Sequence, residues 1–290
     1  MTVPLSARQV GIVLMLASAL LFSSAGLFTK GVAATAWQVI FWRALFSAVL
    51  TFGMVALRGR WRPEVTQMGA QGLLVAVISA LATAAFLSAF KLTAVANVAL
   101  IYAATPLVAA LLAWVLLRER PGRWMVVGAC VGLTGIAVIL GGSLGEMHLR
   151  GDLLALCMAL GLSMLFVLYR AWPAVPAAGP TALSSILLLP VAGWMAPPLG
   201  VPLFEIAVLA AFGLVFAVAS VLMLEAAKRL PSGQAGLLST SETPFAMLLA
   251  WLILSEWPDP MTWTGGALVM AGVLLGGLRR DQPGNVPSST

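Results

Sequence analysis

Long apolar stretches separated by short polar segments dominate the chain from about residue 10 to residue 278. A helix that crosses a bilayer needs about 20 mostly apolar residues. Ten stretches approach or reach that length, namely residues 10–29, 35–57, 68–90, 95–117, 124–142, 151–171, 180–196, 203–227, 233–254 and 261–278. The pattern predicts an all-α membrane protein with ten transmembrane helices. The connecting loops are too short to form a soluble domain.

The composition agrees with lipid as the solvent. Of the 290 residues, 61% are hydrophobic and 9% are charged, and the mean hydropathy is +1.03. Soluble domains carry about 25% charged residues, so a soluble core could not bury this much apolar surface. The net charge of +6 comes from basic residues scattered through short loops, which argues against a nucleic-acid partner. Cys130 and Cys157 lie in apolar stretches without metal-type spacing, and we expect no metal or cofactor.

One stretch of the chain occurs twice. Residues 89–124 read AFKLTAVANVALIYAATPLVAALLAWVLLRERPGRW, and residues 226–263 read AAKRLPSGQAGLLSTSETPFAMLLAWLILSEWPDPMTW. Both contain a Lys, an apolar helix interrupted by Thr-Pro, a Leu-Ala-Trp step, a Glu and a Pro, at an offset of about 137 residues. A duplicated half with an interrupted helix is typical of a membrane transporter.

Lys and Arg in the loops predict the orientation, because cytoplasmic loops carry an excess of both. With the N-terminus inside, twelve basic residues lie inside: Arg8, Arg58, Arg60, Arg62, Arg118, Arg120, Arg123, Arg170, Lys228, Arg229, Arg279 and Arg280. Three lie outside: Lys30, Lys91 and Arg150. Both termini are therefore predicted to be cytoplasmic.

The loops after the two copies differ in charge. The first copy ends in the basic loop RERPGR, whereas the second ends in SEWPDP, which has no basic residue. The copies are therefore predicted to be inverted repeats, residues 1–145 and 146–280, followed by a disordered cytoplasmic tail, residues 281–290. In such proteins the substrate binds near the bilayer midplane between the repeats.

These motifs occur in an order that resembles a known family. The first helix has a small-polar step and a trailing Lys in Leu20–Lys30, and the second, Trp37–Leu50, contains Arg43. An Ala-aromatic-Lys step, the Thr-Pro helix and a Glu before a Gly-rich helix follow. The chain resembles the EamA-type ten-helix transporters of the drug/metabolite transporter superfamily, although Phe22 stands where many members have Trp.

The resemblance implies a carrier that exports amino acids, other metabolites or drugs. Among the branches, the chain is most similar to bacterial exporters of aromatic and other neutral amino acids. We therefore expect a multi-pass secondary transporter of the bacterial inner membrane that works by alternating access, as a monomer or a homodimer. Its expected partners are a small-molecule substrate and the lipid bilayer. The alternative is a multidrug efflux carrier for lipophilic compounds.

Pro106 and Pro244 lie near the middle of their helices in the two copies. Proline cannot donate to the carbonyl four residues earlier, which leaves the carbonyls of Tyr102 and Thr240 free. A free carbonyl at this depth must face protein, water or substrate. We interpret the paired prolines as kinks that shape a central cavity, and the alternative is a static kink without a role in transport.

Two charged residues lie deep in the predicted bilayer. Glu242 is a candidate for contact with a substrate ammonium or for carrying a coupling proton, and the alternative is a neutral acid that locks two helices. Arg43 lies at a comparable depth, about 12 Å from the outer end of its helix. It could pair with Glu242 or bind a substrate carboxylate, and a structural pairing or snorkelling is the alternative.

Polar and aromatic residues at the same depth are candidates for the cavity wall. They are Ser23, Ser24, Trp42, Ser79, Thr83, Phe86, Tyr102, Ser163, Ser239 and Ser241. An aromatic and mostly uncharged wall suits a substrate with an apolar side chain, and the alternative for each residue is helix packing. Gly128-x3-Gly132 and Gly272-x3-Gly276 predict close helix contact, within the chain or in a dimer.

Enzyme chemistry finds no support in the sequence. His148 is the only histidine and lies in a loop, and no Ser/His site, Asp-rich prenyl-transfer motif or P-loop is present. We therefore predict a carrier without catalytic residues.

Overall fold

A computed structural model of the chain describes residues 6–57, 59, 64, 66–118, 122–142, 148–258 and 260–277. Every regular element in these ranges is a helix, as predicted. In chain order they are α1 (Ala7–Phe22), α2 (Ala25–Lys30), α3 (Ala36–Leu57), α5 (Gly69–Leu92), α6 (Val95–Ala103), α7 (Thr105–Leu117), α8 (Arg123–Gly142), α9 (Leu149–Ala171), α10 (Ala178–Met195), α11 (Leu203–Ala227), α12 (Ser232–Ser239), α13 (Glu242–Leu254) and α14 (Pro260–Gly277). The predicted tail, residues 281–290, lies outside the described residues.

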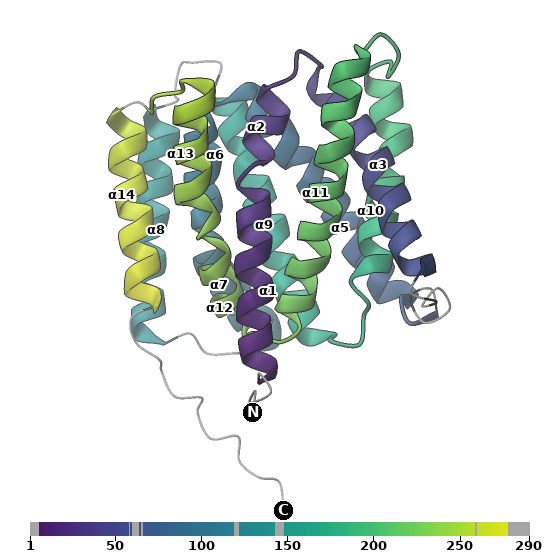
Figure 1. The fold of residues 1–290 in the computed structure, drawn as a ribbon. Coiled ribbons are helices and arrows are strands. Elements are labelled where there is room, and N and C mark those ends of the chain that lie inside the picture. Colours follow the sequence, from purple (N-terminus) through teal and green to yellow (C-terminus); the bar gives the residue numbers. More distant parts are fainter. Residues whose placement is uncertain are drawn as a thin grey trace, which may run out of the picture.

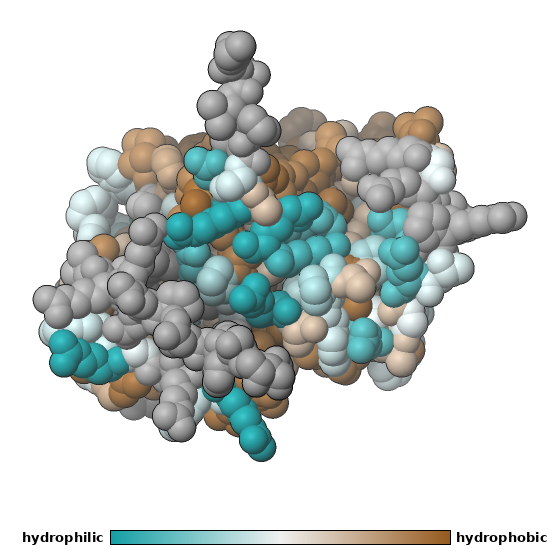
Figure 2. Space-filling view, turned by 90° about the horizontal axis from the view of Figure 1, so that it is seen from below, coloured by the Kyte–Doolittle hydropathy of each residue, from teal (hydrophilic) through white to brown (hydrophobic). Residues whose placement is uncertain are grey.

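The helices stand side by side in one bundle, and α1 begins on the face where α14 ends (Figure 1). We call this the terminus face, and the face at which α2 ends at Lys30 the opposite face. Figure 2 looks onto the terminus face, where hydrophilic residues gather across the middle. On the sides of the bundle large apolar residues are exposed, among them Trp194 at 85%. Such a surface suits lipid as the solvent.

Seven helical segments of the described chain are long and apolar enough to cross a membrane. They are Ala7–Lys30, Ala36–Leu57, Gly69–Leu92, Val95–Leu117, Leu149–Ala171, Ala178–Met195 and Leu203–Ala227. These segments correspond to seven of the ten predicted spans. Arg123–Ile139 and Phe245–Leu254 are apolar but shorter, so the full count of ten spans stays a prediction.

Glycines bring α8 and α14 into backbone contact. A Cβ atom added to Gly272 would lie 2.5 Å from the carbonyl oxygen of Gly128 and 2.7 Å from the nitrogen of Gly132. A Cβ added to Gly135 would lie 2.5 Å from the carbonyl oxygen of Gly265. The prediction of close packing at Gly128, Gly132 and Gly272 is thus confirmed, and the contact is made within the chain.

Three of the described helices are interrupted in the middle of the bundle. Ser23 and Ser24 separate α1 from α2, and each hydroxyl donates to the carbonyl three residues earlier. Such bonds satisfy the carbonyls that a helix end exposes.

The other two interruptions are those predicted at the Thr-Pro steps. Each lies just before its proline, because proline is tolerated in the first turn of a helix but not in its interior. Thr105 Oγ1 donates to the carbonyl of Tyr102, which Pro106 leaves free. This is the compensation expected from the sequence. Thr243 Oγ1 instead donates to the carbonyl of Ala99 in α6, at 3.0 Å.

The two copies of the interrupted helix run in opposite directions. The backbone nitrogen of Val95, where α6 begins, donates to Oε2 of Glu256, just beyond the end of α13, at 3.0 Å. At the other end of the pair, a Cβ added to Gly236 in α12 would lie 2.6 Å from Cα of Pro106 in α7. Figure 1 accordingly shows α13 beside α6 and α12 beside α7.

Candidate functional site

A cavity of about 70 Å³ lies where the three interrupted helices meet. Phe22 is the last residue of α1, Tyr102 is next to last in α6, and Glu242 is the first residue of α13, and all three line the cavity. The remaining described wall comes from α5, α9, α10 and α11: Ser79, Ala82, Thr83, Phe86, Met158, Leu162, Leu165, Thr181, Ser184, Phe216, Ser220, Met223 and Leu224. Among these residues Glu242 carries the one ionisable carboxyl group, in a wall of aromatic, aliphatic and hydroxyl side chains.

Glu242 is held between the two copies of the repeat. It is 5% exposed, and a side-chain hydrogen bond joins it to Tyr102 of the first copy. Glu242 lies in the first turn of α13, at the positive end of the helix dipole, which favours a negative charge there. The next residue, Thr243, also bonds to the first copy through the carbonyl of Ala99. Glu242 therefore presents an anchored acid to the cavity.

Five of the residues selected from the sequence line this cavity: Ser79, Thr83, Phe86, Tyr102 and Glu242. Three others are buried but lie outside the described wall. Ser163 Oγ donates to the carbonyl of Thr105 at 3.1 Å and to that of Ala159 at 2.7 Å, Ser239 Oγ donates to the carbonyl of Gly236 at 2.7 Å, and Pro106 packs against Gly236. These three shape the interruptions rather than the cavity surface.

Trp42 lies away from the cavity. Its indole Nε1 donates to the carbonyl of Pro198 in the loop between α10 and α11, at 3.1 Å. The ring also stacks on Phe46 with 6.1 Å between centroids. Pro244 lies in the first turn of α13, and its side chain falls outside the described part of the structure.

Arg43 does not form the hypothesised ion pair with Glu242 in this structure. The face of α3 that carries Arg43 packs against α10 and α11. The guanidinium carbon lies 4.0 Å from the centroid of the Phe216 ring. Because Phe216 also lines the cavity, its ring forms a wall shared by Arg43 and the cavity.

Sequence reasoning missed the contribution of α10 and α11 to the wall. Thr181, Ser184, Phe216 and Ser220 line the cavity, but an apolar helix with isolated hydroxyls gives no sign of which face is inward. Thr181 and Ser184 lie near the start of α10, and Ser220 lies in the second half of α11. Both of these helix ends are at the terminus face, so the cavity extends toward that face.

Polar contacts tie the opposite face across the two copies. Lys30, at the end of α2, forms an ion pair with Glu256, whose other oxygen accepts from the nitrogen of Val95. Nearby, Ala34 donates its backbone N–H to Oε2 of Glu205 at 3.0 Å, and Lys91 Nζ donates to the carbonyl of Val32 at 2.8 Å. These contacts join α2, α5, α6, α11 and the segment after α13 at that end, beside a second cavity lined by Ala34, Thr35 and Lys91.

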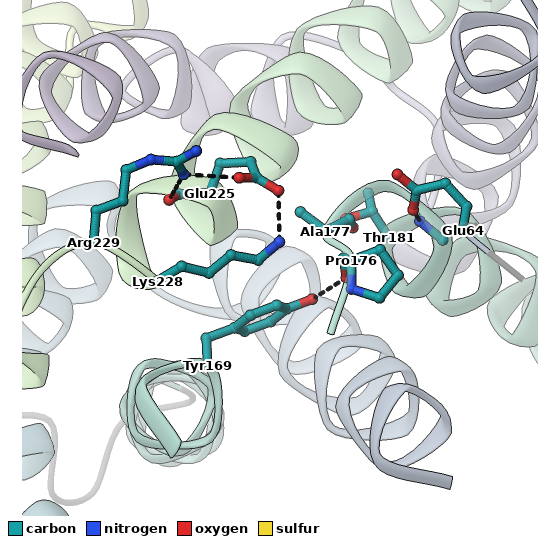
Figure 3. Close-up of polar contacts among 9 residues, drawn as sticks. Glu64, Tyr169, Pro176, Ala177, Thr181, Glu225, Lys228 and Arg229 are labelled. Carbon is teal, nitrogen blue, oxygen red and sulfur yellow. Dashed lines mark hydrogen bonds and ion pairs between the residues drawn. The ribbon is translucent and has the colours of Figure 1, made fainter. Parts of the chain in front are cut away.

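On the terminus face the ionic contacts are local (Figure 3). Glu225 pairs with Lys228 at 2.7 Å and with Arg229 at 2.8 Å, three and four residues farther along the chain. The Tyr169 hydroxyl donates to the carbonyl of Pro176 at 3.1 Å. These ion pairs join neighbours in sequence, but Oε2 of Glu64 accepts a hydrogen bond from the backbone nitrogen of Gly179 in α10 at 2.9 Å and so joins distant segments. The ion pair of the opposite face joins α2 to Glu256, just beyond α13.

Comparisons with known proteins agree with this architecture. Residues 9–141 and residues 149–277 each match the EamA-like transporter family. The chain is 28% identical to an uncharacterized transporter of Bacillus subtilis, YwfM, over 220 residues, which is 70% of this chain and 71% of that protein. A known crystal structure superposes on this chain with a TM-score of 0.69 at 22% sequence identity. The superposition covers 92% of this chain and 96% of the other.

Proposed function

The chain belongs to the EamA-like family of the drug/metabolite transporter superfamily and is a multi-pass membrane transporter, and from this premise we propose that it exports amino acids with aromatic or other neutral side chains. The observation that carries the proposal is the single carboxyl group of Glu242 in a cavity wall of aromatic and hydroxyl side chains. In this proposal the carboxylate receives the substrate ammonium, and the aromatic rings of Phe22, Phe86 and Phe216 contact the apolar side chain.

The size of the cavity favours a small cargo over the alternative of multidrug efflux. Its volume of about 70 Å³ gives space for several water molecules. Pockets for drug-sized ligands measure about 300–1,000 Å³. Even an amino acid therefore requires the wall to move, and the helix interruptions beside Phe22, Tyr102 and Glu242 are the places where short half-helices can shift.

This movement forms the second part of the proposal, which is alternating access. Residues 1–145 and 146–280 act as two inverted repeats, and the cavity between them opens to one face at a time. The protein lies in the bacterial inner membrane with both termini in the cytoplasm. The opposite directions of the two interrupted helices support this arrangement, and so does the start of α1 on the face where α14 ends.

The test is uptake of a labelled amino-acid panel into proteoliposomes of the purified protein, with and without a pH gradient. We expect flux of aromatic and neutral amino acids. We expect Glu242→Gln to lower that flux about 10-fold to 100-fold, because a charge-assisted hydrogen bond contributes about 1.5–3 kcal/mol. If Glu242 also carries the coupling proton, its replacement removes the effect of the gradient as well.

Glu205→Gln is the matched control, because Glu205 is also partly buried but lies at the opposite face, where a Gln oxygen can still accept from Ala34. Its flux should stay within about twofold of the unsubstituted protein, which is within the range of a surface substitution. Efflux of lipophilic cations without amino-acid flux would instead establish the alternative cargo. Equal flux in both Gln variants would remove Glu242 from substrate binding.

A further inference from the structure

The guanidinium of Arg43 is buried and lacks hydrogen-bond partners. The residue is 0% exposed, and Nε, Nη1 and Nη2 form no hydrogen bond to any group in the described part of the chain. A buried charge without partners is strongly unfavourable, and proteins retain such groups mainly for function. The face of the Phe216 ring offers partial compensation but accepts none of the in-plane N–H bonds that a guanidinium makes.

Packing prevents Arg43 from reaching the lipid headgroups. Arg43, Ser47 and Thr51 follow one face of α3 at intervals of one turn, and each is 0% exposed. A Cβ added to Gly213 of α11 would lie 3.0 Å from the carbonyl oxygen of Arg43 and 3.0 Å from the nitrogen of Ser47. The two helices thus meet backbone to backbone at this level. The burial of Arg43 argues against snorkelling, which was one alternative derived from the sequence.

Two other buried hydroxyls in α3 and α5 also lack partners. Ser79 Oγ in α5 lines the cavity, and Thr51 Oγ1 lies two turns from Arg43 on α3; neither has a hydrogen-bond partner among the described groups. Phe216 separates the guanidinium from the cavity itself. A rotation of this ring would expose the N–H donors of the three guanidinium nitrogens to a molecule in the cavity.

We propose that Arg43 is the carboxylate-binding residue of the transport site, and that Phe216 covers it until a substrate enters. A carboxylate matches the planar fork of guanidinium donors with two parallel hydrogen bonds. The inference rests on the proposed function and narrows it: the cargo is a zwitterion whose carboxylate binds Arg43 while its ammonium binds Glu242. Arg43 then distinguishes amino acids from amines that carry the same side chain.

The experiment measures the binding of four probes to the purified full-length protein. L-Phenylalanine carries a carboxylate that 2-phenylethylamine lacks. In the second pair, 3-phenylpropionate carries a carboxylate where 3-phenylpropanol carries a hydroxymethyl group. The unsubstituted protein should bind each carboxylate at least about tenfold more tightly than its partner, as expected for a charged hydrogen bond. Equal affinities within both pairs would overturn the proposal without any substitution.

Arg43→Met retains an unbranched apolar stem and removes the guanidinium with its charge and donors. It should lower the affinity for both carboxylates at least about tenfold, and it should change the affinity for the amine and the alcohol by less than about threefold. Arg43→Lys keeps the charge without the fork and should fall between the two. Ser47→Ala, one turn away on the same buried face, is the control. Any effect of this substitution on binding should be equal for all four probes.

The outcomes separate this proposal from the proposed function. If L-phenylalanine does not bind while 3-phenylpropionate binds in an Arg43-dependent manner, amino-acid transport fails and the carboxylate assignment stands. If Arg43→Met weakens the binding of the carboxylates, the amine and the alcohol alike, Arg43 has a structural role and the assignment fails. Because the Met variant replaces an unpaired buried charge, its melting temperature should equal or exceed that of the unsubstituted protein, which shows independently that the variant is folded.

Discussion

A buried polar chain joins α9, α6 and α14 through Asp152, Asn97 and Thr262. Asp152 is 0% exposed, and it accepts a hydrogen bond from Thr93 Oγ1 at 2.6 Å and from Asn97 Nδ2 at 3.1 Å. Asn97 Oδ1 in turn accepts from Thr262 Oγ1 at 2.6 Å. Three helices distant in sequence are therefore connected by a continuous series of side-chain hydrogen bonds. In an apolar bundle such a network specifies which helix faces meet.

Replacing Thr262 with Val should destabilise the protein. Val retains the shape of Thr but removes the hydroxyl that donates to Asn97 Oδ1, and the loss of one hydrogen bond costs about 0.5–1.5 kcal/mol. Thermal unfolding of the purified protein in detergent should show a lower melting temperature. Thr264→Val, two residues away, is the control, because Thr264 is exposed and donates to the carbonyl of Pro260 within its own helix. Equal melting temperatures for the two variants would contradict the importance of the network.

At the scale of helices, interruptions and glycines have separate tasks. The interruptions of α1–α2, α6–α7 and α12–α13 bring polar helix ends to the cavity, whereas the glycines of α8 and α14 hold these two helices at backbone contact. Neither α8 nor α14 contributes to the described cavity wall. The α8–α14 pair is thus a structural part of the bundle.

Gly135→Ala should therefore lower stability although Ala favours helix. Its Cβ would lie 2.5 Å from the carbonyl oxygen of Gly265 and 2.7 Å from the nitrogen of Val269, so backbone would have to move. Overpacking of this kind costs about 1–3 kcal/mol. The control is Gly53→Ala in α3, where no atom lies within 4 Å of the added Cβ. There the substitution should stabilise by about 0.5–1 kcal/mol. Melting temperatures that fail to move in opposite directions would refute this assignment.

For the molecule as a whole, carboxylates join distant segments at both faces of the bundle. The opposite face is tied by the Lys30–Glu256 ion pair and by the bond from Val95 to the same carboxylate, which link α2, α6 and the end of α13. At the terminus face Glu225 pairs with Lys228 and Arg229 nearby in sequence, and Glu64 accepts from the backbone nitrogen of Gly179 in α10. We infer that breaking the Glu256 contacts favours opening at the opposite face.

Thiol labelling from each side of the membrane tests this inference. Cys130 and Cys157 are exposed and are first replaced with Ala, and Ser184→Cys then introduces one thiol into the cavity wall. Glu256→Gln should speed its labelling by an impermeant reagent applied at the opposite face and slow it at the terminus face. Glu225→Gln, the control, should shift the two rates much less. An unchanged ratio of rates in Glu256→Gln would show that these contacts do not hold the face closed.

The sequence by itself determined that lipid surrounds the protein, that the chain is helical, and where two of the three interruptions lie; the interruption at Ser23 and Ser24 was not predicted. Long apolar runs predicted the helices, and the Thr-Pro steps at Pro106 and Pro244 predicted two interruptions, because these properties depend on residues close together along the chain. The position of Glu242, next to an interruption in an apolar stretch, was enough to select it as a candidate. Its depth and that of Arg43 were also readable from residue counts along a helix.

The tertiary structure alone decided which side chains meet. It joins Glu242 to Tyr102 across the two copies, turns Arg43 toward Phe216 instead of Glu242, and adds Thr181, Ser184 and Ser220 to the cavity wall. In a helix that is apolar on all sides, the sequence carries little periodic signal for the inward face. Rotation and neighbours are set by packing against helices distant in sequence, such as the close approach at Gly213, and that packing is a property of the whole bundle.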